Sequence, residues 1–130
     1  MRLFSSIPLV ITALALTLGA NLTPCVAQSA RAPYEADMQR LAEILGALHY
    51  LRAICGANEG QTWRNEMQAL IDADAPGGDR RERLIGSFNR GYRGFQQTYR
   101  TCTPAANIAI RRYLDEGAKI ARDITARYAN

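Results

Sequence analysis

Residues 85–102, IGSFNRGYRGFQQTYRTC, decide the fold. Large apolar and aromatic residues recur there at spacings of three and four: Ile85, Phe88, Tyr92, Phe95, Tyr99 and Cys102. Side chains three and four positions apart share one face of a helix, so this spacing is typical of a helix with one buried stripe. Upstream, Asp79 and Glu82 match a capping box, the pattern that opens many helices. The sequence therefore predicts a long helix that Asp79 caps and that is buried along its aromatic stripe.

On the N-terminal side, two more segments show the helical period. The first begins near Pro33, because proline suits a first helical turn, and ends at Gly56, because glycine commonly follows a helix end. Its predicted inner face is Met38, Leu41, Ile44, Leu45, Leu48 and Leu51. The second opens at Gly60 or Thr62 and stops at residues 74–78, DAPGG, the strongest break in the chain. Its predicted inner face is Trp63, Met67, Leu70 and Ile71.

On the C-terminal side, Thr103 and Pro104 form a cap followed by proline at the first helical position. They predict a last helix, whose inner face would be Ile110, Tyr113, Leu114, Gly117, Ile120, Ile124 and Tyr128. No stretch alternates with a period of two for long enough to form a strand. Helices joined by short connections favour an up-down-up-down arrangement. The sequence thus predicts an all-α fold, an antiparallel bundle of four helices.

The cysteines agree with that arrangement. Cys55 ends the first predicted helix and Cys102 ends the third, so both lie at one pole of such a bundle, where a disulfide needs Cα atoms within about 7 Å. In an oxidising compartment two cysteines in a small domain indicate a bridge. It would close a 48-residue loop, a constraint that contributes about 4 kcal/mol in the chain-entropy model. The alternative is two buried free thiols.

The N-terminal residues resemble an export signal. One positive charge at Arg2 precedes the apolar run 7–18, which is short of the roughly 20 residues that a membrane-spanning helix needs. Small residues at Cys25 and Ala27 fit a signal peptidase site that cleaves before Gln28. We therefore expect a signal peptide over 1–27, a short polar segment over 28–32 and a helical domain over 33–130, in the periplasm or secreted.

Two alternatives to cleavage stay open. Residues 3–20 are long enough for an uncleaved anchor, and residues 22–25, LTPC, are similar to a lipoprotein box in which Cys25 is lipidated. Pro24 fits that box poorly, because a small residue is required before the cysteine. With cleavage near Ala27, no stable membrane span is expected in the mature chain.

The composition of the mature part limits its partners. Removing 27 of 130 residues leaves 103, with 15 basic and 12 acidic residues and a formal charge of +3. Nearly all the positive charge is arginine, Lys119 being the single lysine. Such a charge permits attraction to anionic lipid or wall polymer. A nucleic-acid partner is not expected, since no dense basic run is present.

No catalytic or metal-binding pattern is recognisable, so we expect no cofactor, no metal and no catalytic residue. His49 is the single histidine, and no cysteine or carboxylate stands at ligand spacing from it. It falls at the edge of the first helix's apolar stripe, where a surface or half-buried role is expected. The alternative to a non-enzymatic protein is an enzyme that acts on cell-wall material, with Glu59 or Glu66 near Trp63 as the acid–base group. It requires a cleft and a carboxylate with a raised pKa.

Possible partner-binding residues gather on two segments. Arg90, Arg93 and Arg100 line one flank of the third predicted helix beside Tyr92, and arginine next to tyrosine suits carboxylates, phosphates or sugar rings. The alternative is helix packing with a solvated arginine flank. Gly91 and Gly94 cost about 1 kcal/mol each relative to alanine, which indicates a closely approaching helix or ligand, or a bend.

Trp63 and Arg64, which follow the polar loop 56–62, form the other candidate. A tryptophan beside a polar loop can serve as a platform for a sugar or a peptide. The alternative is a large core residue.

These same stretches carry a family resemblance. Residues 55–64, CGANEGQTWR, and residues 88–93, FNRGYR, followed by Cys102, resemble an uncharacterised family of small exported alphaproteobacterial proteins. The resemblance covers roughly residues 35–130 and implies a signal peptide and two cysteines that form a disulfide. It implies no activity and no catalytic residue.

The leading functional hypothesis is a non-enzymatic periplasmic protein that binds a partner in the cell envelope, either a protein or an anionic wall or lipid component. The cell-wall enzyme is one alternative. The other is a structural envelope protein that assembles through an exposed Tyr/Phe stripe.

Overall fold

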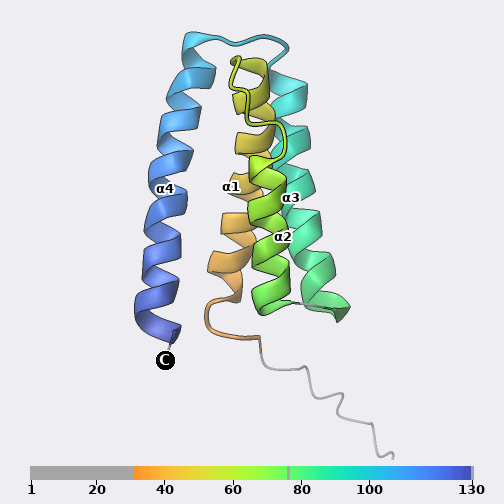
Figure 1. Ribbon diagram of the computed structural model, residues 1–130, viewed down its shortest axis with the longest axis vertical. Helices are drawn as coiled ribbons and strands as arrows, with labels where there is room; N and C mark the ends of the chain where they lie inside the picture. Colours follow the sequence, from red (N-terminus) through yellow and green to blue (C-terminus); the bar gives the residue numbers. More distant parts are fainter. Residues whose placement is uncertain (1–30, 76, 130) are drawn as a thin grey trace, which may run out of the picture. The chain divides into compact units, whose positions relative to one another are not determined.

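The computed structural model describes residues 31–75 and 77–129, which form four α-helices and no strand (Figure 1). The helices are α1 (Glu35–Ile54), α2 (Thr62–Asp74), α3 (Gly78–Thr98) and α4 (Pro104–Tyr128). Consecutive helices run in opposite directions, so the predicted all-α bundle of four helices is confirmed. The predicted signal peptide, residues 1–27, lies outside the described residues.

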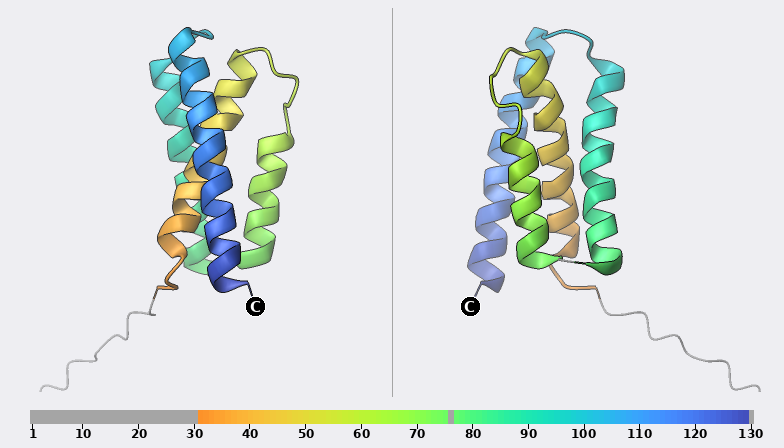
Figure 2. Two further views of the ribbon diagram at one scale, coloured as in Figure 1. Left: turned by 90° about the vertical axis from the view of Figure 1, so that its left-hand side faces the viewer. Right: turned by 45° about the vertical axis from the view of Figure 1, so that its right-hand side comes forward.

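The bundle is built around α1. This helix contacts each of the other three, and its contact with α3 is the largest. Among the described residues the main chain of α4 packs against α1 and no other helix, while the Tyr113 ring of α4 meets the Phe95 ring of α3 edge-on, with centroids 5.5 Å apart. In the right-hand view of Figure 2, α1 lies between α4 and α3. A helix surrounded in this way has to be apolar on most sides. Its buried residues are Glu35, Met38, Ala42, Ile44, Leu45, Gly46, Ala47, Leu48 and Leu51.

The main chains of α1 and α3 touch at two glycines. A Cβ atom on Gly91 would overlap the carbonyl oxygen of Glu43, and one on Gly46 would overlap the carbonyl oxygen of Phe88. A closely approaching helix is therefore the reason for Gly91. Gly94, in contrast, has open space at its Cβ position.

The buried face of α3 differs from the predicted stripe. Leu84, Ser87 and Gly91 are its buried residues, whereas Ile85 is 36% exposed. The stripe is displaced because α1 approaches too closely for large side chains at the centre of the contact. The aromatic rings of α3 pack beside that contact and are half-buried.

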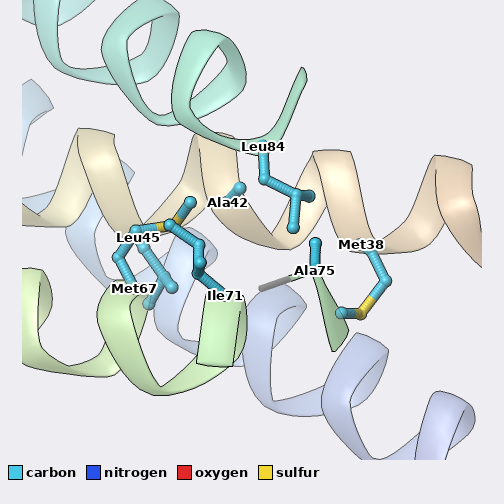
Figure 3. Close-up of a cluster of buried hydrophobic side chains, with 7 residues drawn as sticks. All are labelled: Met38, Ala42, Leu45, Met67, Ile71, Ala75 and Leu84. Atoms are coloured by element: carbon cyan, nitrogen blue, oxygen red, sulfur yellow. The ribbon is translucent and has the colours of Figure 1, made fainter. Parts of the chain in front are cut away.

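Two apolar clusters fill the bundle. One joins α1, α2 and the start of α3 (Figure 3) and consists of Met38, Ala42, Leu45, Met67, Ile71, Ala75 and Leu84. The other joins α1 to α4 nearer the disulfide and consists of Ile44, Ala47, Leu48, Leu51, Ala106, Ile110 and Tyr113. All the residues contributed by α1 were predicted to be apolar core or are small, so its predicted inner face is largely confirmed.

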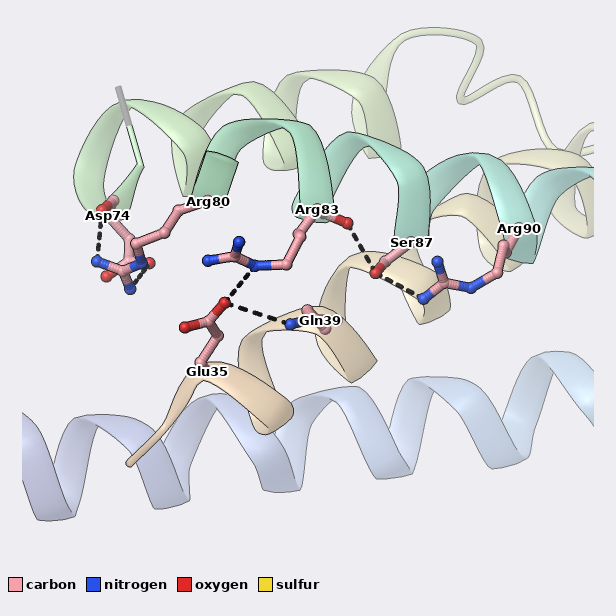
Figure 4. A network of polar contacts seen from close by, with 7 residues as sticks. All are labelled: Glu35, Gln39, Asp74, Arg80, Arg83, Ser87 and Arg90. Atoms are coloured by element: carbon pink, nitrogen blue, oxygen red, sulfur yellow. Dashed lines mark hydrogen bonds and ion pairs between the residues drawn. The ribbon is translucent and has the colours of Figure 1, made fainter. Parts of the chain in front are cut away.

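A polar network ties α1 to α3 at the end away from the disulfide (Figure 4). Glu35, 5% exposed, accepts hydrogen bonds from Arg83 Nε at 2.5 Å and Gln39 Nε2 at 3.4 Å. Ser87 Oγ donates to the Arg83 carbonyl at 2.9 Å and accepts from Arg90 at 2.8 Å. The buried carboxylate and hydroxyl thus have partners on the facing or same helix.

The helix ends follow the sequence in two cases and depart from it in one. Gly56, at φ 80°, ends α1 in a Schellman motif, with its N–H on the Ala53 carbonyl and the Ala57 N–H on the Arg52 carbonyl. Thr103 Oγ1 accepts from Ala106 N at 3.1 Å and so caps α4. The predicted capping box of α3 is wrong, because α3 begins two residues earlier than predicted, at Gly78, with Gly77 at the cap position. Asp79 therefore lies inside the first turn.

Cys55 and Cys102 form the predicted disulfide, with Cα atoms 4.7 Å apart. Cys55 is the C-terminal cap of α1, and Cys102 lies in the connection between α3 and α4. We call this end of the bundle the disulfide pole; it comprises the end of α3, the connection 99–103 and the start of α4.

Candidate functional site

The structure spreads the predicted binding arginines over separate surfaces. Arg64, on α2, and Arg90, Arg93 and Arg100, on α3 and the connection after it, are all exposed. Arg90 donates to Ser87 Oγ on its own helix and borders a polar pocket with Glu35 and Glu43 of α1. These four side chains therefore do not converge on one ligand.

Tyr92 belongs to an aromatic series between α1 and α3. Its ring centroid lies 5.6 Å from that of His49 and 5.4 Å from that of Tyr50. The Tyr50 hydroxyl donates to the Tyr99 carbonyl, and Tyr99 stacks on Phe95. This geometry is that of helix packing, the alternative that the sequence left open for the aromatic stripe.

His49 is half-buried between Phe88 and Tyr92, as expected for a residue at the edge of the stripe. Burial lowers the pKa of His49, and the positive charge of Arg64 lowers it further. Its imidazole is therefore held in the neutral form at neutral pH.

Trp63 is half-buried and packs against both apolar clusters. Its Nε1 donates to Glu59 Oε2 at 2.9 Å, and Arg52 Nε donates to the same oxygen at 2.9 Å. The hydrogen bond from Arg52 holds the pKa of Glu59 below its usual range. A general acid needs the opposite shift, so this geometry argues against Glu59 in the enzymatic alternative.

A groove between α2 and α4 was missed by the sequence analysis. Its floor is α1, and its two walls are helices that do not touch each other. Its upper part, beside Trp63, has a volume of about 540 Å³, and a lower part of about 340 Å³ continues it toward Tyr34 and Tyr128. The upper part is lined by Leu41, Ile44, Leu45, Leu48, Trp63, Glu66, Ala69, Leu70, Ala73, Tyr113, Leu114, Gly117, Ala118 and Ala121.

We call this feature the α2–α4 groove. The predicted inner face of α4 included Leu114 and Tyr128, but these are 37% and 38% exposed because they face the groove instead of a neighbouring helix. The alanines at positions 69 and 73 of α2 and 118 and 121 of α4 were the available signal, since small residues three and four apart extend each apolar face.

The disulfide pole is strongly basic. Residues 93–114, from the end of α3 into α4, include four arginines, Arg93, Arg100, Arg111 and Arg112, and no carboxylate. None of these four forms an ion pair within the described part of the chain. Ile108, one turn into α4, is 59% exposed, and exposed Arg111 and Arg112 follow it at three and four positions on the same side of the helix.

Comparison with known families adds one match. A family described as proteins of unknown function, DUF2385, matches residues 33–128, most of the chain. The chain belongs to the DUF2385 family. No curated protein and no solved structure matches it.

The DUF2385 domain also lacks two kinds of feature in the residues that the structure describes. In residues 31–75 and 77–129, no three His, Cys, Asp or Glu side chains are grouped so that they could hold a metal ion. None of the helices described is both long and apolar enough to cross a membrane. The DUF2385 domain thus offers two surfaces with a distinct chemistry, the α2–α4 groove and the basic disulfide pole.

Proposed function

We propose that this protein is a non-enzymatic binding protein of the cell envelope that docks its disulfide pole on an anionic phospholipid surface. The observation that carries the proposal is the run of residues 93–114 at the pole, which holds four arginines, no carboxylate and the exposed Ile108. Arginine guanidinium groups bind phosphate through paired hydrogen bonds.

The magnitudes favour a weak and reversible contact. Each arginine close to an anionic leaflet contributes about 1 kcal/mol. Burying an isoleucine side chain in the interface adds about 1.5–3 kcal/mol. An anionic wall polymer would use the arginines but offers no apolar layer for Ile108, and for this reason we propose lipid.

The envelope location rests on the sequence. An export signal over residues 1–27, cleaved before Gln28, and membership of a family of small exported proteins are part of the proposal. Intact mass of the protein from the periplasmic fraction, with and without reductant before alkylation, tests it. A mass that starts at Gln28, with thiols that react only after reduction, is expected. A mass that retains residues 1–27, or one increased by lipid on Cys25, would replace cleavage with one of its alternatives.

Vesicle cosedimentation tests the lipid proposal. The oxidised protein should bind phosphatidylglycerol vesicles, not phosphatidylcholine vesicles, and binding should weaken with salt because the attraction is screened. Reversing charge at the pole, with Arg100→Glu and Arg112→Glu, should abolish it. The matched control, Arg81→Glu and Arg127→Glu, makes the same change in net charge at the opposite end and should retain most of it.

Ile108→Ser separates lipid from wall polymer. The substitution should weaken vesicle binding by about tenfold or more at constant charge, because the apolar contribution of one side chain is lost. If wild type ignores anionic vesicles, the proposal is wrong. If it instead binds a soluble anionic polymer with an affinity that Ile108→Ser does not change, the partner is a wall component.

A further inference from the structure

We infer that the α2–α4 groove is the interface between two copies of this chain, with α4 of each copy lying in the groove of the other. This inference rests on the groove and is independent of the lipid proposal, which rests on the pole.

The first argument is that the groove is apolar and unfilled. Side chains from α1 form its floor, and the two parts enclose volumes of about 540 and 340 Å³. Leu114 is 37% exposed at its edge. Within the described chain the main chain of α4 packs on α1 alone, with a ring contact to α3 between Tyr113 and Phe95, so the apolar side of α4 that faces the groove stays uncovered.

The second argument concerns what shape fits. Small residues line both walls: Ala69 and Ala73 on α2, and Gly117, Ala118 and Ala121 on α4. Helix axes pack 8–10 Å apart depending on the side chains at the contact, and alanine and glycine permit the closest approach. A groove with these walls receives a helix along its length.

The third argument, charge, selects a second copy. The α2 edge carries Glu66, which lines the groove, and the exposed Asp72, which lies about 60° from Ala69 on a helical wheel. On the α4 edge, Arg111 and Arg122 lie within about 40° of Ala118 on a helical wheel, and Asp115 lies about 60° away. One edge is therefore acidic and the other has a net positive charge. A two-fold interface requires this self-complementarity, because the same patch has to supply both halves.

The charges also select the symmetry axis. A two-fold axis along the helices brings the α2 edge of one copy against the α4 edge of the other. An axis across the helices would place α2 on α2 and α4 on α4, which opposes like charges. The axis therefore runs along the bundle, and both disulfide poles lie at the same end of the dimer.

Sedimentation equilibrium of the oxidised protein tests the interface by exchanging charges. Wild type should dimerise. Glu66→Lys with Asp72→Lys makes both edges basic and should raise the dissociation constant by about tenfold or more. Arg111→Glu with Arg122→Glu makes both edges acidic and should do the same. Each variant should be mostly monomeric at concentrations where wild type is mostly dimeric.

Mixing the two variants provides the decisive step. In one half of the interface the lysine edge then meets the glutamate edge, and in the other half the unchanged acidic edge meets the unchanged arginine edge, so a heterodimer should form at wild-type concentrations. All four substitutions in one chain should also restore a homodimer. Glu82→Lys with Arg93→Glu, on the exposed side of α3, is the matched control and should leave the dimer unchanged. Far-UV circular dichroism establishes that every variant is folded.

Three results would overturn the inference: a wild-type monomer at all concentrations, charge reversals without effect, or variants that do not recover on mixing. A monomeric wild type that instead binds an acyl-chain probe or a partner's amphipathic helix would assign the groove to that occupant. Vesicle binding by such a monomer would leave the lipid proposal intact, so the two proposals fail separately.

Discussion

Gly46 and Gly91 set how closely α1 and α3 approach. At each position a methyl group would meet a carbonyl oxygen of the facing main chain, which cannot move aside as a flexible side chain can. The two glycines lie near the middle of the α1–α3 contact, which is the largest contact between two helices of the bundle.

Alanine substitutions at two glycines of α3 should therefore have opposite effects. Gly91→Ala should lower the free energy of unfolding by about 3 kcal/mol or more, at or beyond the upper end of overpacking costs. Gly94→Ala, with open space at its Cβ position, should raise it by up to about 1 kcal/mol through helix propensity. Urea unfolding measures both. Equal effects of the two substitutions would contradict the close approach.

His49 should make stability depend on pH. Its pKa is lowered in the folded protein, so the unfolded chain binds the proton at higher pH than the folded chain does. This contribution to stability is fully present above the unfolded pKa of about 6.5 and is lost as pH falls from there toward the folded value. His49→Gln should remove this dependence in urea unfolding series. An NMR titration that places the His49 pKa at or above 6.5 would refute it.

The sequence predicts which residues are buried where each turn of a helix places a large side chain in the core. The apolar positions of α1 follow their period because helices surround α1. On α3 the spacing of the apolar residues predicted the helix correctly but placed the centre of its buried face wrongly, since Ile85 is exposed and Ser87 is buried. Large side chains indicate a buried face only when the neighbouring helix is far enough away to admit them, and that distance is a tertiary property.

Among the elements, α4 depends most on a few connections. Its main chain packs on α1 alone, through the apolar cluster around Ile110 and a paired contact in which Arg40 donates to Glu116 at 2.7 and 3.0 Å. Its contact with α3 is the ring pair Tyr113–Phe95. The disulfide fixes the chain just before its first turn. Loss of the bridge should therefore loosen α4 more than α3.

Cys55→Ser with Cys102→Ser should lower the free energy of unfolding by up to about 4 kcal/mol, the value expected for a loop of this length. Amide hydrogen exchange should rise more in α4 than in α3, because α3 keeps its backbone contact with α1. Reduced wild type serves as the control and should match the double variant. A uniform rise along the chain would show that α4 is not the least anchored helix.

Helix ends were predictable where a single residue determines them. Gly56 and Thr103 act as expected. Gly56 adopts the positive φ that ends α1, and Thr103 Oγ1 accepts a hydrogen bond from a free N–H in the first turn of α4. The capping box failed because Asp79 has to be outside the helix to cap it. Two adjacent glycines, 77 and 78, allowed the helix to begin earlier.

At the scale of the whole molecule, the two proposals combine. In a dimer whose axis runs along the helices, two basic poles face the same plane, so the second contact with a membrane follows the first at high effective concentration. Glu66→Lys with Asp72→Lys should weaken binding to phosphatidylglycerol vesicles, although it adds positive charge. Stronger binding by this variant would show that charge alone counts and that the dimer contributes nothing.

The candidate surfaces differed in how far the sequence could reveal them. The run 93–114 at the pole is free of carboxylates, and this can be seen in the sequence alone. The arginines singled out, Arg90, Arg93 and Arg100, were nevertheless chosen for their position beside Tyr92. The α2–α4 groove could not be predicted from the sequence. The helical period predicts which side of a helix is buried, but it does not say which helices leave a gap between them.

The α1–α3 pairing also has a consequence for the order of events as the chain is made. α2 separates the two helices in sequence, so the largest contact of the bundle closes only after α3 has emerged. Contacts between distant segments form late because loop closure has an entropic cost that no local contact offsets. Until then α1, the most apolar helix, has α2 as its one cover. A nascent chain that stops at Asp74 should therefore have little helix in far-UV circular dichroism. Stable folding requires the second half of the domain.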